Sequence, residues 1–310
     1  MTSLRRAVVV LALVAGTALA AAASGARSDH SPDALAVRGA GGWETWWRQD
    51  GAPTRWNGEA TLAARVAWRS GISGMEWGEL QLRGASEAWR TRVVLVRFDP
   101  RRLELSLATA FTRNEGWTVA DADSGVALAL DAGQFRHSLP WGWVVSQGRE
   151  VLPPEYAPLA GAVVVDSSGI LRIVAPDSVV AARERGTARE AFQSYPMLLL
   201  DGVIPVPLRK AGQGVDLAHR DARLALGTLA DGRVIVALTR FDALGESFGQ
   251  VPLGLTTPEM AAVMGGLGCR QALLLDGGIS GQLMLRKADG SVRSWAGTRS
   301  VPLGLVGRMR

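Results

Sequence analysis

Hydrophobic and polar residues alternate over short stretches along most of this chain, a pattern typical of β-strands with one buried face. Residues 93–98 are rich in β-branched side chains, and every second residue of 103–107 is leucine. Because Asp99-Pro100 marks a turn, we expect these two segments to form antiparallel strands. Further strands are predicted at residues 126–130, 162–165, 171–174, 197–200, 224–229 and 234–238.

One segment predicts a helix instead. Thr256 and Glu259 have the spacing of a capping box, Pro258 falls in the first turn, and glycines at 265, 266 and 268 can end the helix. A strand at 272–275 then leads to Asp276. Many strands and few helices predict an α+β fold, a mixed and mostly antiparallel twisted sheet with a few packed helices.

The first residues carry the pattern of a secretory signal peptide. Arg5 and Arg6 precede an apolar stretch over 8–19, and small residues continue to Ala23. Residues 1–23 are therefore predicted to be a leader, and the protein to be secreted, periplasmic or associated with the cell envelope. The alternative is a retained anchor, although the apolar stretch is shorter than the roughly 20 residues of a typical span. No later segment predicts a membrane span.

Residues 24–60 are rich in Gly, Ala, Pro and Trp and predict a linker that merges into an irregular Trp-rich arm, whereas 61–310 form the folded domain. The tryptophans of the arm can stack on sugar rings, but burial against the domain is the commoner arrangement.

Charge and cysteine content exclude some classes of protein. Removing the leader deletes Arg5 and Arg6 and no acid, so the net charge falls from +5 to +3. The basic residues are scattered, which argues against a nucleic-acid partner. Cys269 is the single cysteine, so the chain forms no internal disulfide and its stability must come from the core.

Two acids at the ends of predicted strands are the strongest candidates for chemistry. Asp276 follows an apolar strand and precedes Gly277 and Gly278, which allow a ligand to approach the main chain. Asp131 repeats the order of apolar strand, acid and glycine, and sugar hydrolysis generally uses a pair of carboxylates. The alternative is that both acids are ordinary turn residues.

Four segments in sequence order resemble the phosphodiester glycosidase domain. Residues 254–285 resemble its C-terminal signature, 131–135 its Asn-x-Gly-x-Phe element, 193–197 with 201–202 its Gln-Ser-Gly-Pro element and Asp-Gly turn, and 223–227 its Arg-Thr-Ala-Ile-Gly strand. The resemblance covers roughly residues 75–307. Asp131 stands where the family has Asn, Tyr195 where it has Gly and Leu224 where it has Thr; the first change introduces a charge and removes a donor.

The resemblance implies hydrolysis of a sugar from a sugar-1-phosphodiester or a related envelope glycan. It implies that Asp131, Asp276 and Arg223 are catalytic, with the Arg223 guanidinium holding phosphate oxygens. It further implies that the substrate-binding residues are Gly133, Ser194, Gly277, Gly278 and Ser280.

Three other functions remain as alternatives. A serine hydrolase built on Ser280 would need glycine where Gln282 stands, and only His137 and His219 could supply its base. A metal hydrolase lacks a His pair or Cys cluster, although a divalent cation bound by carboxylates near Asp276 or Asp201 stays open as the one candidate cofactor. The third is a non-catalytic carbohydrate-binding envelope protein of the same fold.

Overall fold

The computed structural model describes residues 34–84, 90–242 and 251–310. The predicted leader and the retained-anchor alternative lie outside these residues. Within the described part of the chain, no helix has the length and apolar character needed to cross a membrane.

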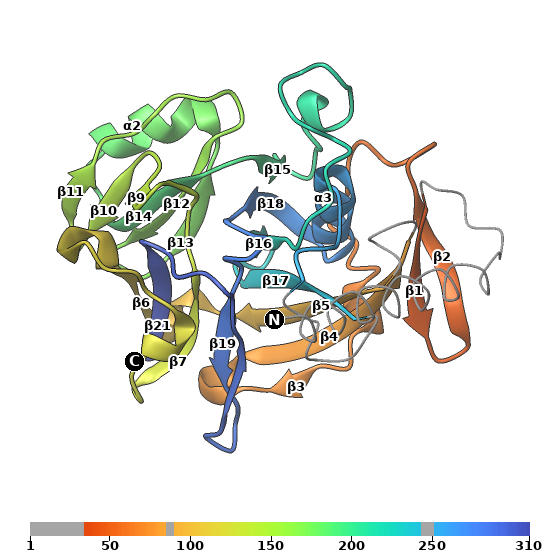
Figure 1. Ribbon diagram of the computed structural model, residues 1–310, viewed down its shortest axis with the longest axis horizontal. Helices are drawn as coiled ribbons and strands as arrows, with labels where there is room; N and C mark the ends of the chain where they lie inside the picture. The colour runs from red at the N-terminus through yellow and green to blue at the C-terminus, as the bar shows by residue number, and fades with distance from the viewer. Residues whose placement is uncertain (1–33, 85–89, 243–250) are drawn as a thin grey trace, which may run out of the picture.

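The largest sheet has nine strands and runs across the centre and right of Figure 1. Its order is β15 (Met197–Leu199), β18 (Cys269–Leu274), β16 (Leu224–Leu229), β17 (Val234–Phe241), β5 (Thr91–Phe98), β4 (Glu76–Arg83), β1 (Ala34–Gly39) and β2 (Gly42–Arg48), with β3 (Arg69–Ser70) paired to β4. The strands predicted at 197–200, 224–229, 234–238 and 272–275 all belong to this sheet.

Two five-stranded sheets and a short ribbon complete the β-structure of the described residues. One has the order β11 (Arg149–Leu152), β10 (Val144–Ser146), β14 (Ala188–Ser194), β12 (Gly161–Asp166) and β13 (Leu171–Val174). The other has the order β20 (Val292–Trp295), β19 (Leu283–Arg286), β7 (Val126–Asp131), β21 (Gly304–Met309) and β6 (Leu103–Ala108). The ribbon joins β8 (Phe135–Arg136) and β9 (Leu139–Pro140).

Every strand pairing between these elements is antiparallel, whereas the predicted sheet was mixed and mostly antiparallel. The helical part is smaller than expected, because the described residues hold only the α-helices α2 (Val179–Glu184) and α3 (Thr257–Gly266). The fold is therefore compatible with the predicted α+β class but consists mostly of β-structure.

The predicted helix at Thr256 is confirmed as α3. Thr256 Oγ1 accepts a hydrogen bond from the Glu259 amide at 3.3 Å, and Glu259 Oε2 accepts one from the Thr256 amide at 2.9 Å. These reciprocal bonds form the capping box. All ten residues of the helix are buried, so α3 is a core element that leads directly into β18.

The expected pairing of residues 93–98 with 103–107 is wrong. Both segments are strands, but β5 pairs with β4 and β17, whereas β6 pairs with β21. The 3₁₀ turn at 100–102, capped by Asp99 Oδ1 at 3.0 Å from the Arg101 amide, carries the chain from one sheet to the other. The apolar faces of the two strands meet in one core cluster, so packing and not pairing joins them.

Part of the predicted irregular arm is regular. Residues 34–48 form the β1–β2 hairpin, and β1 extends the large sheet by pairing with β4. Trp47 is buried in the core of this region, while Trp43 remains 39% exposed. The hairpin forms because its inward side chains complete a core that residues distant in sequence begin.

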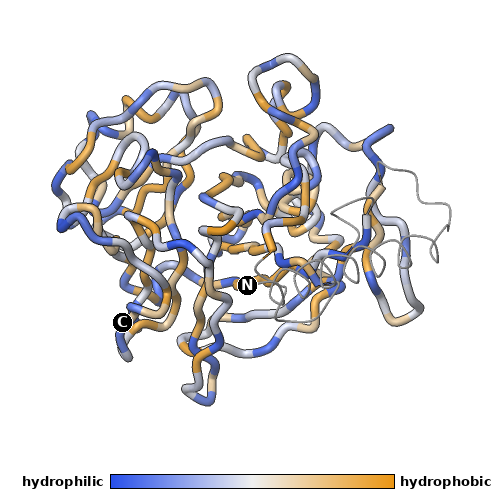
Figure 2. Tube along the Cα trace, in the orientation of Figure 1, coloured by the Kyte–Doolittle hydropathy of each residue, from blue (hydrophilic) through white to orange (hydrophobic). Residues whose placement is uncertain are grey.

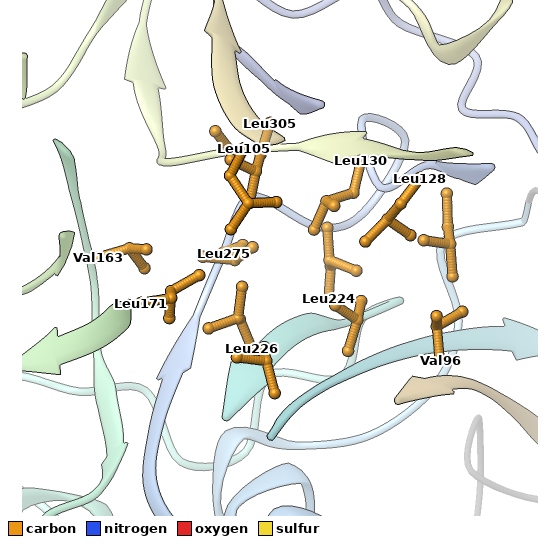
Figure 3. Packing of buried hydrophobic residues seen from close by; sticks show 14 of the residues in the cluster. Val96, Leu105, Leu128, Leu130, Val163, Leu171, Leu224, Leu226, Leu275 and Leu305 are labelled. Carbon is orange, nitrogen blue, oxygen red and sulfur yellow. The ribbon is translucent and has the colours of Figure 1, made fainter. Parts of the chain in front are cut away.

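The central core lies between the three large sheets. Figure 3 shows apolar side chains converging from several of their strands, including Val96, Leu128, Leu171 and Leu226. Hydrophobic residues concentrate along the strands in Figure 2, and hydrophilic residues concentrate at many of the turns. This packing holds the ends of β7, β16 and β18 in fixed positions, where the predicted site residues lie.

Candidate active site

The segments that carry Asp131 and Asp276 meet where two sheets face each other. Asp131 ends β7, and Asp276 follows β18 after one residue. The Asp276 amide donates to the Ala132 carbonyl at 3.3 Å, and the charge of Asp276 raises the pKa of Asp131. The structure therefore brings together the two acids proposed as a pair.

Asp131 is completely buried. Its Oδ1 accepts a hydrogen bond from the Gln282 amide at 3.0 Å, whereas Oδ2 has no partner among the described residues. Burial, reinforced by Asp276, raises its pKa well above the ordinary value despite opposing backbone hydrogen bonds and the charge of Arg240. Burial therefore favours the protonated form of Asp131, and a protonated carboxyl group has one donor and one acceptor side, as an asparagine amide does. A protonated Asp131 would keep the hydrogen-bonding pattern of the family's Asn.

Asp276 is the ionisable partner. Burial raises its pKa to about 6, and the nearby charge of Asp221 acts in the same direction. The Ser280 hydroxyl, the charge of Arg299 and the Gly277 amide oppose this rise. Burial thus raises the pKa of both acids, and Asp276, with a pKa of about 6, ionises close to neutral pH.

The glycines after Asp276 serve close packing. Gly278 has φ +58°, and its amide donates to the Ala222 carbonyl at 2.8 Å. A Cβ at Gly277 would lie 2.5 Å from the same carbonyl oxygen. The Gly278 amide is thus already hydrogen-bonded within the protein, and the Gly277 amide donates a hydrogen bond that lowers the pKa of Asp276. The resemblance, in contrast, implied that both residues bind substrate.

Arg223 lies beside this loop, immediately before β16. Ala225 pairs with Leu274, and that register places Arg223 opposite Asp276. Its Nε donates to the Leu255 carbonyl at 2.9 Å and its Nη2 to the His219 carbonyl at 2.7 Å. Burial lowers the pKa of Arg223, although nearby acids partly restore it. Nε and one N–H of Nη2 hold the main chain, which leaves both N–H groups of Nη1 and the second N–H of Nη2 as candidate contacts for phosphate.

Two other predicted binding residues, Ser194 and Gly133, contact the segments that carry the acids. The Ser194 side chain is fully buried, and its hydroxyl donates to the Leu274 carbonyl at 2.6 Å, which fixes the end of β14 to β18. A Cβ at Gly133 would lie 2.1 Å from the Gln193 carbonyl oxygen, so only glycine permits this approach. In this arrangement Ser194 and Gly133 position the acids. Ser280 is also buried but contacts Asp276 directly.

Sequence reasoning missed Asp221. Its Oδ1 accepts a hydrogen bond from the Ala222 amide at 2.8 Å, and a Cβ at Gly278 would lie 3.0 Å from its Oδ2. Its side chain is 26% exposed, so it is the accessible acid beside the loop. His219 Nε2 lies 3.7 Å from Asp221 Oδ2. In the sequence, Asp221 lies two residues before Arg223 in a loop, and no pattern around it indicated a functional role.

Two arginines were also missed. Arg240 is buried on β17, where its Nη2 donates to the Gly281 carbonyl at 2.6 Å, and its charge favours ionised Asp131. Burial lowers the pKa of Arg240 to about 10. Position 240 shares a strand face with Val236 and Leu238, and that periodicity could have revealed it. Arg299 lies over the Phe135 ring at 4.7 Å and acts electrostatically on Asp276.

The two positions considered for a cation differ in their surroundings. Asp201 forms an ion pair with Arg270 and lies in a turn with φ +49°, whereas Asp276 belongs to the acid cluster. Across the described ranges, no three His, Cys, Asp or Glu side chains are placed to hold a metal ion.

Comparison with known proteins identifies the family and the fold. The family model of the phosphodiester glycosidase domain matches residues 114–306. The catalytic domain of zebrafish N-acetylglucosamine-1-phosphodiester α-N-acetylglucosaminidase, auto-inhibited by its pro-peptide, is similar in structure, with a TM-score of 0.59 and 17% identity over 79% of this chain and 88% of that one. A hypothetical protein from Synechocystis has a TM-score of 0.52 and 15% identity over 76% of this chain and 62% of that one. No curated protein matches the sequence.

The structural likenesses show a shared fold, and the family model covers more than half of the chain, including the Asp131, Arg223 and Asp276 segments that converge here. This chain belongs to the phosphodiester glycosidase family.

Proposed function

We propose that this protein is an exported hydrolase that cleaves a sugar from a sugar-1-phosphodiester or a related envelope glycan. The observation that carries the proposal is the meeting of Asp131, which is fully buried, with Asp276, which is half-buried, since burial raises the pKa of both carboxyl groups. Glycoside hydrolases usually carry a pair of carboxyl groups, and the surroundings of the two groups give them different pKa values.

In the proposed reaction, water attacks the anomeric carbon and the bond from this carbon to the phosphate oxygen breaks. Asp276, ionised above about pH 6, accepts the proton of the water, and the phosphate leaves as a monoester that needs no strong acid. Arg223 Nη1 and Arg299 are the cations that stabilise the phosphate. Asp131, through Gln282 and Ala132, positions the loop of Asp276.

Turnover of sugar-1-phosphodiesters tests the proposal, with N-acetylglucosamine, glucose and mannose as the sugar. Asp276→Ala should lower kcat by about 10²- to 10⁴-fold, the usual contribution of a positioned acid or base. Asp177→Ala is the control, because Asp177 is an exposed acid in the 3₁₀ turn between β13 and α2, outside the segments that carry Asp131, Arg223 and Asp276. Absence of turnover by the wild-type protein on all of these substrates would contradict the proposal.

A non-catalytic carbohydrate-binding protein is the second candidate. The complete burial of Asp131 and the internal use of the Gly278 amide favour it, since both reduce the groups available to a substrate. Saturable binding of the same phosphodiesters without hydrolysis would support this alternative.

A further inference from the structure

A surface pocket of about 610 Å³ lies beside the β1–β2 hairpin, formed by residues between 45 and 65. All of these residues precede position 114, where the match to the phosphodiester glycosidase model begins. The residues that line the pocket therefore lie outside the matched segment, which carries both acids.

The aromatic wall of this pocket is built against α3. The Trp46 and Trp56 rings stack with centroids 5.7 Å apart and planes 24° from parallel. Two glycines make room for them, because a Cβ at Gly265 would lie 2.3 Å from Trp56 and a Cβ at Gly266 would lie 2.4 Å from Trp46. Trp46 Nε1 also donates to Thr61 Oγ1 at 3.3 Å. The indoles are thus held in place before any ligand arrives, which lowers the entropy lost on binding.

Charged and hydroxyl side chains complete the lining. Arg48 and Asp50 are exposed at the pocket, and Arg65 lies there with its guanidinium bound to Glu44 at 2.7 Å. A sugar presents an apolar ring face together with hydroxyl groups that both donate and accept hydrogen bonds. Half-buried tryptophan rings beside an arginine and a carboxylate match these two kinds of surface.

We propose that this pocket, here called the hairpin pocket, is a second carbohydrate-binding site that holds a glycan chain at a distance from the acids. α3 ends at the hairpin pocket, and the six residues of β18 lead from it toward Asp276, a length of roughly 20 Å. In Figure 1 the β1–β2 hairpin stands to the right of α3. An oligosaccharide offers several sugar rings to the hairpin pocket, whereas a monosaccharide offers one. The proposal does not depend on catalysis at Asp276.

The competing explanation is that Trp46 and Trp56 only attach the hairpin to α3. Variants of the exposed polar side chains separate the two explanations, because they leave the stacked indoles in place. The test uses the purified full chain on immobilised N-acetylglucosamine, glucose and mannose, each as monosaccharides and as longer oligosaccharides, with tryptophan fluorescence as a second readout.

We expect the wild-type protein to bind the longer oligosaccharides and the double variant Arg48→Ala with Asp50→Ala to bind them at least about tenfold more weakly. Arg149→Ala with Asp177→Ala is the matched control, since it removes the same two charges from exposed positions elsewhere. Asp276→Ala should retain oligosaccharide binding even if it abolishes hydrolysis.

Three results would overturn the proposal. They are no binding of any oligosaccharide by the wild-type protein, unchanged binding by the hairpin-pocket variant, and loss of all binding in Asp276→Ala. The last result would place the glycan at the acids alone, and none of the three depends on whether the protein hydrolyses phosphodiesters.

Discussion

The protonation of single side chains decides what this site can do. Asp131 and Asp276 lie in the same cluster, and each has one buried carboxyl oxygen without a hydrogen-bond partner among the described residues, but Asp131 is completely buried whereas Asp276 is half-buried. Because a buried charge without a partner is unfavourable, the folded protein binds a proton at Asp131 more tightly than the unfolded chain does. The free energy of unfolding must therefore depend on pH.

Asp131→Asn should stabilise the protein above about pH 5. The folded-state pKa of Asp131 is raised, so its contribution to stability is present below the unfolded pKa near 3.8 and is lost as pH rises toward the folded pKa. Asparagine has no such loss. Thermal melts from pH 4 to pH 8 should show a rising Tm advantage of the variant, with Asp177→Asn unchanged. A variant less stable than the wild type at pH 8 would mean that the carboxyl group is required.

The pKa of Asp276 predicts a limb in the pH profile of hydrolysis. If ionised Asp276 accepts a proton from water, kcat/KM should fall below about pH 6 and approach a plateau above it. Measured profiles for the wild type and for Arg299→Gln check this. Removing the nearby cation, which lowers the pKa of Asp276, should move the limb to higher pH. A limb that does not move would assign it to another group.

Arg223→Lys should lower kcat/KM on a sugar-1-phosphodiester by about tenfold to a thousandfold, corresponding to about 1.4 to 4 kcal/mol. Lysine keeps the charge but cannot hold the Leu255 and His219 carbonyls while also reaching phosphate. A neutral aryl glycoside should be affected far less. Equal losses on both substrates would show that Arg223 acts through the fold or the sugar.

At the scale of elements, the site depends on how closely the loop after β18 packs on the segment before β16. The Gly278 amide donates to the Ala222 carbonyl, and the Ser280 amide donates to the Gly277 carbonyl. The Asp221 carboxylate also lies against Gly278. The loop has little space to adapt at Gly277, because the atoms nearest to a Cβ there belong to the backbone of Ala222 and Arg223.

Gly277→Ala should therefore reduce both stability and activity. The new methyl group would lie 2.5 Å from the Ala222 carbonyl oxygen, so the loop must shift, at a cost of about 1 to 3 kcal/mol. Gly41→Ala is the matched control, because a Cβ there meets nothing within 4 Å. Denaturant unfolding and turnover measure the two effects. Wild-type stability and turnover in Gly277→Ala would show that the loop does not depend on this close packing.

At the scale of the whole molecule, the N-terminal hairpin, α3 and β18 form one continuous unit from the hairpin pocket to Asp276. The leader belongs to this scale as well, although it lies outside the described residues. We predict that the mature protein begins between Ala20 and Ser28 and is recovered outside the cytoplasmic membrane. N-terminal sequencing of the exported protein checks this prediction, and an intact Met1 would contradict cleavage.

Local patterns in the sequence predicted many of the strands, their mostly antiparallel character and the capped helix α3, because alternation and capping are properties of neighbouring residues. They did not predict β1, β2, β4, β14 or the three C-terminal strands β19, β20 and β21. They also predicted Asp131 and Asp276, each an acid at the end of an apolar strand. They could not show that β5 and β6 belong to different sheets, since pairing depends on which distant strands share the core. The raised pKa of Asp131, the hydrogen bonds from Arg223 to the main chain and the position of Asp221 beside the loop were decided by tertiary structure alone. Burial and charge at these residues come from segments far apart in the chain, which only folding brings into contact.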